Sequence, residues 1–390
     1  MRQSNRGVLT ASAALVVVSL LAACGSSLYT STITADSVKL GLLVPQSGVY
    51  APLGTDIRRG FELYLDGRGG QLGNRRVTVV VADEGAEPDT GVPAGQKLIQ
   101  QSQVAVAVGV VNSATALGLV QQFNAAKVPL IIANAGANAL TGAKASAYVW
   151  RTSFSNDDAG ASMGAYVASR VDSGGVYLIA PDYAAGHEQI AGFRRAFEAA
   201  GGHVAGADYP PFGTTSNYQP YLARIQRSGA RAVFAFFAGA EAVAFVKQYK
   251  EFGLAGTIPL YATGYLTEGA VLRSEGDAAV GIQTALQYSS ELDTPTNRAF
   301  VSAYTAKYHS SPTVFSVAAY DAAQVLDHAL ANATTGPEIV AALGRLGDID
   351  SPRGTWRFSA THNPTQRYYL REVREQDRTL VNAVVRTLTN

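Results

Sequence analysis

The chain has 390 residues, of which 47% are hydrophobic and 16% charged, with 31 basic against 30 acidic side chains. These values are typical of a well-packed globular chain, exclude a disordered polymer, and favour two domains because the length exceeds one usual core. The formal net charge is +1 and no basic stripe is visible, so nucleic acid and anionic lipid headgroups are poor candidates for a partner.

The N-terminal segment is typical of a secretory signal peptide. Two arginines precede an apolar run that ends at small residues before Cys24, the single cysteine of the sequence. Residues 21–24 (Leu-Ala-Ala-Cys) resemble a bacterial lipobox, in which the cysteine becomes the lipidated first residue. We expect a signal peptide over residues 1–23, a flexible tether over 24–35, and an extracytoplasmic lipoprotein held to the cell membrane by its lipid alone. The alternative is an ordinary signal peptide that is cut near Cys24.

After the tether, short apolar runs rich in β-formers alternate with segments whose apolar residues recur at helical spacing. The first series predicts strands over residues 38–45, 76–84, 104–111 and 128–134, with helices over 52–70, 90–101 and 113–127. The alternation restarts and predicts helices over 160–171, 186–202 and 240–253, with strands over 174–181, 231–239 and 257–263. Later helices are predicted over 297–309 and 314–333, and a hairpin-like region over 354–373. This order predicts an α/β fold of two lobes, each with a parallel sheet covered by helices on both faces.

The carboxyl ends of the predicted strands are the expected position of a ligand, because open α/β sheets bind their ligands there. This rule selects residues 46–54, 111–115 and 133–137 in the first lobe, and 181–186, 238–241 and 263–266 in the second. Small residues in these loops, such as Gly239, let backbone N–H groups approach a ligand, and helix N-termini favour a carboxylate.

Three long segments, taken in chain order, carry a family resemblance. In one class of proteins, the first strand and ligand loop are similar to residues 38–66, and the Gly-Gly turn and second strand are similar to residues 67–99. The serine-bearing loop of that class is similar to residues 108–140. That class is the leucine/isoleucine/valine-binding group of extracytoplasmic solute-binding proteins of ABC importers. The resemblance implies the type I periplasmic-binding-protein fold, in which two Rossmann-like lobes are joined by three crossover strands and close by hinge motion.

The same resemblance implies the division of the chain and its partners. Residues 36–151 and 285–352 would form lobe 1, and residues 152–284 and 353–390 would form lobe 2. The protein would be a monomeric binding subunit that captures a small molecule and delivers it to ABC permease subunits with cytoplasmic ATPases. It would not be an enzyme and would need no cofactor.

In the first lobe, the resemblance places a ligand carboxylate on Ser113, Asn134 and Gly136, with Thr115 nearby. Ser113 could instead, or in addition, cap the following helix. The first-loop positions of the family correspond to Leu53, with Tyr50 beside it as a possible wall of the site. The alternative for Tyr50 is an exposed loop aromatic.

The second lobe departs from the family pattern. Ala185 stands where an aromatic side chain often precedes the glycine, although Tyr183 lies two residues earlier. Gly264 stands where the amino-acid binders carry an acid for the α-ammonium group. Because an unpaired buried ammonium costs several kcal/mol, this change argues against a branched-chain amino acid and favours a small carboxylate, an amide or an aromatic acid without the amine. Glu241 could supply the missing acid, but we expect it to be an exposed charge at a helix N-terminus.

Two other function classes remain open. Residues 160–164 satisfy the Gly-x-Ser-x-Gly pattern of hydrolases, with Ser162 as nucleophile and His187 as a conceivable base. The preceding residues are polar rather than an apolar strand, so we expect Ser162 to lie inside a helix. The second class is a ligand-sensing, receptor-type binding protein. The five histidines are scattered and form no cluster with the cysteine, so no metal site is predicted.

Overall fold

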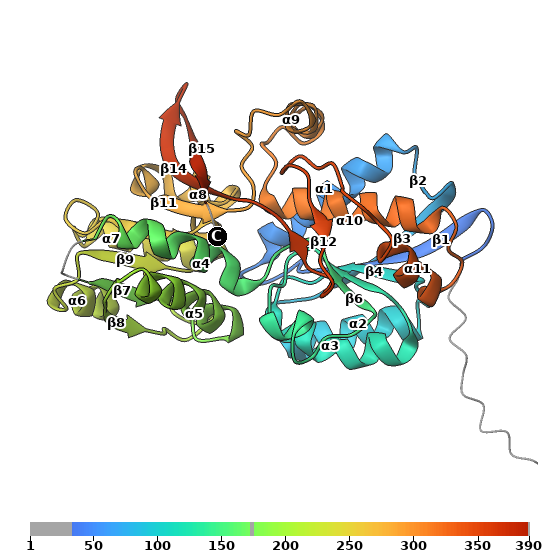
Figure 1. The fold of residues 1–390 in the computed structure, drawn as a ribbon, viewed down its shortest axis with the longest axis horizontal. Helices are drawn as coiled ribbons and strands as arrows, with labels where there is room; N and C mark the ends of the chain where they lie inside the picture. The colour runs from blue at the N-terminus through green and yellow to red at the C-terminus, as the bar shows by residue number, and fades with distance from the viewer. Residues whose placement is uncertain (1–32, 172–174, 389–390) are drawn as a thin grey trace, which may run out of the picture.

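The computed structural model describes residues 33–171 and 175–388. The predicted signal peptide, Cys24 and most of the tether lie outside the described residues. Figure 1 shows two α/β lobes side by side, with the N-terminal strands in one and the middle of the chain in the other. In the described part of the chain, no helix is long and apolar enough to cross a membrane.

The first lobe is built on a six-stranded sheet in the order β2-β3-β1-β4-β5-β6. All neighbours pair in parallel except the short β2, which is antiparallel to β3. The strands are β1 (Ser37–Val44), β2 (Gln71–Leu72), β3 (Arg75–Asp83), β4 (Val106–Gly109), β5 (Leu130–Ile132) and β6 (Val149–Arg151). Its helices are α1 (Ala51–Gly67), α2 (Pro88–Gln100), α3 (Ser113–Ala126), α9 (Pro295–Tyr308), α10 (Val314–Leu330) and α11 (Gly336–Leu343), with the 3-10 turn η1 (Asn138–Thr141).

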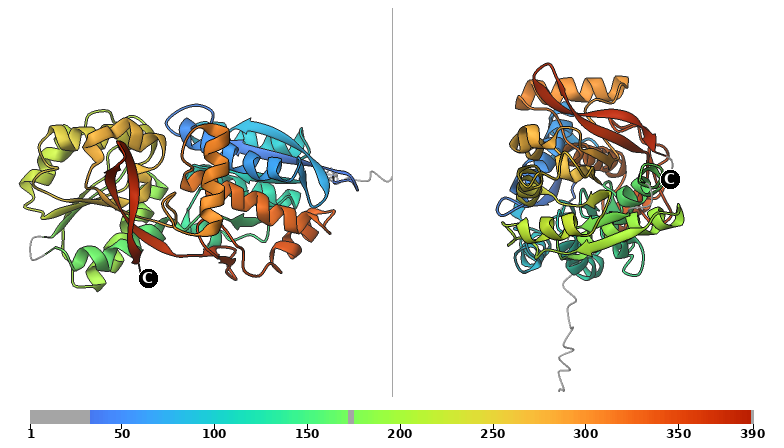
Figure 2. Two further views of the ribbon diagram at one scale, coloured as in Figure 1. Left: turned by 90° about the horizontal axis from the view of Figure 1, so that it is seen from above. Right: turned by 90° about the vertical axis from the view of Figure 1, so that its left-hand side faces the viewer.

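The second lobe is built on a seven-stranded sheet in the order β15-β14-β11-β10-β9-β7-β8. Its strands are β7 (Val176–Ile179), β8 (Val204–Asp208), β9 (Ala232–Ala235), β10 (Leu260–Thr263), β11 (Gln283–Leu286), β14 (Tyr368–Gln376) and β15 (Thr379–Leu388). Its helices are α4 (Asn156–Ala168), α5 (Ala184–Ala199), α6 (Gln219–Arg227), α7 (Gly239–Glu251) and α8 (Ala270–Glu275), with 3-10 turns η2 (Gly264–Thr267) and η3 (Gly276–Ala279). The last two strands form an antiparallel hairpin that runs along one edge of the lobe (Figure 2).

Both sheets have helices on their two faces, as the continuous apolar strands predict. In the first lobe α1 packs on α10, while α2 packs on α3 on the opposite side (Figure 1). In β9, Phe234 belongs to one buried cluster with α4 and α5, whereas its neighbours Val233 and Ala235 belong to another with α6 and α7. This alternation is the period of two expected for a strand between two helical layers.

In the described part of the chain, two of the passages between the lobes lie away from the expected lobe boundaries. β11 pairs with β10 as far as Ala285 and with β14 as far as Leu286, so residues 285 and 286 belong to the second sheet. After α11 the chain stays with the first lobe beyond residue 352. The small sheet of β12 (Arg357–Phe358) and β13 (Pro364–Thr365) lies there, and the His362 ring stacks on Trp150 at 3.7 Å between ring centroids. We therefore place the crossings after Arg151, after Leu286 and between His362 and Tyr368.

Most of the predicted elements are present with ends shifted by a few residues. The helix predicted over 160–171 starts earlier, at Asn156, because Ser155 and Asp158 form a capping box there. The hairpin-like region over 354–373 is two features, the β12–β13 pair and the start of β14. Among the described residues, the strands β2, β6, β8, β11 and β15 and the helices α6, α8 and α11 lie outside the predicted strands and helices.

Candidate functional site

A cavity lies between the two lobes, at the carboxyl ends of their strands. Its free volume in this structure is about 20 Å³, far below the range usual for small-molecule sites, because the lining side chains of the two lobes close it almost completely. The lining residues come from both lobes: Tyr50, Leu53, Val111, Ser113, Asn134, Gly136, Phe154, Asn156, Tyr183, Ala185, Gln189, Phe236, Ala238, Tyr265 and Phe315. In each sheet the strand order reverses between two neighbouring strands, which are β1 and β4 in the first lobe and β7 and β9 in the second. The loops that follow these four strands supply Tyr50, Val111, Tyr183 and Phe236.

Seven of the ten predicted binding residues line this cavity: Tyr50, Leu53, Ser113, Asn134, Gly136, Tyr183 and Ala185. The other three, Thr115, Gly239 and Gly264, are not among the lining residues.

The first-lobe wall is organised by the start of α3. Asn112, not Ser113, is the N-cap: its Oδ1 accepts from the backbone N–H groups of Ala114 and Thr115 at 2.8 and 3.2 Å. Ser113 is the first helical residue, and its hydroxyl accepts from Nδ2 of Asn156, across the cavity, at 3.2 Å. The capping hypothesis for Ser113 is therefore wrong, and its hydroxyl and the helix N-terminus face the second lobe.

A carboxylate supports this wall from behind. Glu84 is fully buried and accepts hydrogen bonds from the backbone N–H groups of Val111 and Asn112, each at 2.7 Å. Burial raises the pKa of Glu84 to about 8, although these hydrogen bonds act in the opposite direction. Glu84 fixes the loop between β4 and α3 but is not among the residues that line the cavity.

Position 136 requires glycine because the side chains of Phe154 and Asn156 approach it closely. A Cβ atom at this position would lie 2.2 Å from Oδ1 of Asn156 and 2.5 Å from Cε2 of Phe154. Both neighbours belong to the segment that leads into the second lobe. Only a residue without a side chain fits here while the lobes are together.

Two tyrosines join the lobes over the cavity. The hydroxyl groups of Tyr50 and Tyr183 are 2.8 Å apart, and the ring of Phe212 stacks on Tyr183 at 4.4 Å and lies 5.7 Å from Tyr50. Burial raises the pKa of both tyrosine hydroxyls, so they are neutral and able to donate or accept. Tyr50 is 4% exposed, and the hypothesis of an exposed loop aromatic is wrong.

Further contacts hold the lobes in this closed arrangement. The backbone N–H of Asn138 donates to Oε2 of Glu188 at 3.0 Å, and the N–H of Val314, at the start of α10, donates to Oε1 of Glu268 at 2.8 Å. Gly239 has a positive φ of 60°, and a Cβ on it would lie 2.3 Å from the carbonyl oxygen of Val49. Gly239 is therefore a contact between the lobes rather than a wall of the cavity.

Thr115 and Gly264 lie behind the cavity wall. Thr115 is fully buried on α3, and its methyl group faces Gly91 of α2. Gly264 is covered by Arg371, whose Nη2 donates to its carbonyl oxygen at 3.1 Å and would be 2.4 Å from an added Cβ. Arg371 in turn forms a buried ion pair with Glu268 at 2.8 Å. An acidic side chain at position 264 would have no room.

The alternative acid, Glu241, differs from the expectation. It is 5% exposed rather than a surface charge, and its Oε1 accepts from the backbone N–H of Gly213 at 2.9 Å. Burial raises its pKa to about 7. Glu241 is not among the residues that line the cavity, so the described wall carries no acid for an α-ammonium group.

Sequence reasoning missed several lining residues. Ala238 and Tyr265 lie inside loops that the strand-end rule had selected, but were not singled out. Phe154 lies in the polar segment before α4 and Asn156 is the first residue of that helix, and the only signal for both was their place at the first crossing. Gln189 and Phe315 lie on helices, where a single sequence does not reveal which face meets a ligand.

The hydrolase hypothesis lacks its structural requirement. Ser162 lies in the interior of α4, is 4% exposed, and donates its hydroxyl to the carbonyl oxygen of Ala159 at 2.8 Å. A nucleophile elbow needs the serine at a sharp turn between strand and helix. His187 is an exposed partner of Asp182 at 2.7 Å. Across residues 33–171 and 175–388, no group of three histidine, cysteine or acidic side chains is placed to hold a metal ion.

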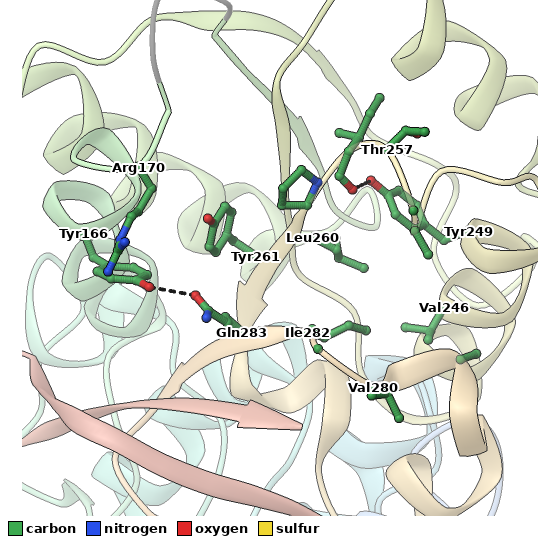
Figure 3. Close-up of a pocket in the computed structure, with 16 residues that line it drawn as sticks. Tyr166, Arg170, Val246, Tyr249, Thr257, Leu260, Tyr261, Val280, Ile282 and Gln283 are labelled. Carbon is green, nitrogen blue, oxygen red and sulfur yellow. Dashed lines mark hydrogen bonds between the residues drawn. The ribbon is translucent and has the colours of Figure 1, made fainter. Parts of the chain in front are cut away.

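A second, more open depression lies in the second lobe alone (Figure 3). Tyr166, whose hydroxyl donates to Oε1 of Gln283 at 2.8 Å, and Arg170 line one side of it, and Tyr249 and Val246 the other. It lies at the amino ends of β10 and β11, opposite to the ends where open α/β sheets bind ligands. Movement of the lobes would not open or close it, so the interlobe cavity is the candidate site.

Comparison with known proteins agrees with this geometry. Residues 37–378 match the family model described as periplasmic binding protein. The Leu/Ile/Val-binding protein homolog 6 of Brucella melitensis is 32% identical over 370 residues, which cover 92% of this chain and 93% of that protein.

Two crystal structures of solute-binding proteins of ABC transporters from R. palustris are similar over nearly their full length. One, in complex with benzoate, has 36% identity and a TM-score of 0.84, covering 90% of this chain and 97% of that one. The other, in complex with 4-hydroxybenzoate, has 30% identity and a TM-score of 0.85, covering 91% and 98%. The chain therefore belongs to the periplasmic binding protein family, as an extracytoplasmic solute-binding protein of the ABC-transporter class with the type I fold.

Proposed function

We propose that this protein captures an aromatic monocarboxylic acid, of the benzoate type, in the interlobe cavity and delivers it to the permease of an ABC importer. One observation carries the proposal: the cavity is lined by six aromatic rings, and none of its described lining residues is charged. Such a wall suits a flat, apolar ring, which it can contact on its faces and edges.

The aromatic rings form a connected wall around Tyr265. Its ring lies 4.8 Å from Phe154, 6.1 Å from Phe236 and 6.1 Å from Phe315, measured between ring centroids. These rings come from the first crossing, the end of β9, η2 and the start of α10. A ring bound among them would touch both lobes at once.

The first-lobe wall offers the groups that a carboxylate needs. The N-terminus of α3 carries the partial positive charge of its helix, and Ser113 adds a hydroxyl group. Asn134, 8% exposed, lies beside them and is fixed by a hydrogen bond from its Nδ2 to the carbonyl oxygen of Val111 at 3.2 Å. We assign the ligand carboxylate to Ser113, Asn134 and the backbone at Gly136.

A branched-chain amino acid fits this cavity less well. Its α-ammonium group would enter a wall without a carboxylate, at a cost of several kcal/mol. Gly264 with Arg371 behind it fills the place where an acid would stand. The benzoate and hydroxybenzoate complexes of the two similar proteins support the choice of ligand.

Transport would follow from closure. A ligand that contacts both lobes stabilises the closed form over the open one, and the closed form would then dock on the permease. Before that, cleavage of the signal peptide would make Cys24 the N-terminal residue. A lipid attached to Cys24 would hold the protein at the outer face of the cell membrane. A ligand-sensing role with the same cavity is the alternative.

Thermal unfolding with a panel of ligands tests the proposal. A ligand present at 100 times its Kd adds about 2.7 kcal/mol to the unfolding free energy. We expect benzoate or a hydroxybenzoate to raise the melting temperature, and leucine, isoleucine and valine to leave it unchanged. Stabilisation by leucine, with no response to any aromatic acid, would refute the proposal.

A further inference from the structure

The cavity contains a buried amide without a partner. Gln189, on α5, lines the cavity and is 0% exposed. Neither its Oε1 nor its Nε2 has a hydrogen-bond partner in the described part of the protein. A buried polar group left unsatisfied costs about 1–3 kcal/mol, so such a side chain in a binding cavity points to a group that the ligand supplies.

The hydroxyl group of Tyr265 is a second buried polar group in the cavity wall. Tyr265 is 3% exposed, and its buried hydroxyl makes no well-formed hydrogen bond among the described residues, although the side chain of Gln287 lies beside it. Tyr265 belongs to η2, whose first residue, Gly264, is held by Arg371. Two separate elements of the second lobe thus bring an unsatisfied polar group to one cavity.

The chemistry of these groups restricts what could satisfy them. The amide of Gln189 has both a donor and an acceptor, while the hydroxyl of Tyr265 can act as either. A carboxylate only accepts and an ammonium only donates, so each leaves half of the amide unpaired. A neutral hydroxyl group donates one hydrogen and accepts others, and it matches both ends.

We propose that Gln189 and Tyr265 are specificity-determining residues that hold a ring hydroxyl group of the ligand, so that the preferred ligand is a hydroxylated aromatic acid rather than benzoate itself. This inference rests on the proposed function, because it assumes an aromatic acid whose carboxylate lies on the first lobe. The second lobe would hydrogen-bond the hydroxyl group and the first lobe the carboxylate, so the closed form would recognise both ends of the ligand. A site built to hydrogen-bond a hydroxyl group discriminates strongly against the analogue that lacks it.

The test compares dissociation constants, measured by isothermal titration calorimetry on the purified full-length protein. The probes are benzoate, 3-hydroxybenzoate, 4-hydroxybenzoate and 4-methylbenzoate, which separates a hydroxyl group from mere size. We expect at least one hydroxybenzoate to bind roughly tenfold or more tightly than benzoate, and 4-methylbenzoate to gain nothing comparable.

Variants assign the preference to the residues. Gln189→Met keeps the length of the side chain without its amide, and Tyr265→Phe removes one hydroxyl. Each should bring the ratio of the benzoate Kd to the hydroxybenzoate Kd toward one. Gln122→Met is the matched control, since Gln122 also has a buried, unpaired Oε1 among the described residues but is not part of the cavity lining. It should keep the wild-type ratio.

The outcomes are distinct. If benzoate binds as tightly as both hydroxybenzoates, or if both Gln189→Met and Tyr265→Phe keep the wild-type ratio, the inference is overturned while the proposed function stands. If Gln189→Met does not fold, Tyr265→Phe decides alone. If no aromatic acid binds, both the inference and the proposed function are overturned.

Discussion

The hydroxyl groups of Tyr50 and Tyr183 lie 2.8 Å apart, although the two residues are 133 positions apart in sequence and belong to different lobes. Tyr50 is the N-cap residue of α1 and Tyr183 is that of α5, so each is fixed at the start of a helix beside the cavity. Their contact exists only while the lobes are closed. It is therefore one of the hydrogen bonds that stabilise the closed form.

We expect Tyr50→Phe and Tyr183→Phe each to weaken ligand binding about fivefold, because a buried hydrogen bond contributes about 1 kcal/mol. The loss should appear mainly as faster dissociation, measured by stopped-flow fluorescence. The double variant should be little weaker than either single one, since both remove the same bond. If the losses of affinity in the two single variants multiply in the double variant, the two hydroxyl groups act separately and their hydrogen bond does not stabilise the closed form.

Gly136→Ala should weaken binding at least tenfold. The added Cβ would lie 2.2 Å from Oδ1 of Asn156, well inside normal contact distance, and would oppose closure. The measurement is the Kd for benzoate and the hydroxybenzoates. Gly67→Ala is the matched control, because no described atom outside its own helical turn lies within 4 Å of its Cβ position at the end of α1. Unchanged affinity in Gly136→Ala would mean that the lobes do not meet at this point in the bound form.

The sequence was sufficient for the parts of the site that follow from strand order. Continuous apolar strands predict parallel sheets, and parallel sheets place the loops after β1 and β4 at one edge. The loops that contain Tyr50 and Ser113 were found in this way, and the family resemblance singled out these two residues within them. Gly264 was also identified as unusual, but its cause, the Arg371 side chain reaching from β14, comes from a strand 107 residues further along the chain.

Other parts could not be predicted because they depend on how distant segments pack. Phe315 lines the cavity from the start of α10, where Glu268 of the other lobe accepts from the N–H of Val314. The segment around His362 has little apolar pattern, and it stays with the first lobe through stacking on Trp150. Strand β8 was missed because it is a half-exposed edge strand rich in alanine and glycine, residues with weak strand signals.

Cys24→Ser should release the protein from membranes. If the cysteine carries the lipid, its removal leaves no anchor, and the variant should move from the detergent phase to the aqueous phase in detergent partitioning. Incorporation of a labelled fatty acid should be lost as well. Ser26→Ala, two residues away, is the control and should partition like the wild type. A Cys24→Ser protein that remains in the detergent phase would contradict the lipoprotein hypothesis.

Glu275→Gln should stabilise the protein in alkaline solution. Glu275 ends α8 and is 3% exposed, and among the described residues neither of its carboxyl oxygens has a hydrogen-bond partner. Burial raises its pKa from 4.5 to about 9, with a small opposing effect of Lys247. The folded state therefore holds the proton more tightly than the unfolded state.

The sign of the pH dependence follows from this shift. The contribution of Glu275 to the unfolding free energy has its full value below pH 4.5, falls as the pH rises toward 9, and levels off above it. The side chain of glutamine does not titrate in this range, so the variant should not show this decrease in unfolding free energy. We expect equal stability of the two proteins near pH 4.5 and a gain on the order of 1–3 kcal/mol for the variant at pH 9, measured by urea unfolding. Glu251→Gln, at an exposed position, should show no such trend. A gain that is the same at every pH would show that the carboxyl group of Glu275 does not titrate in the folded protein.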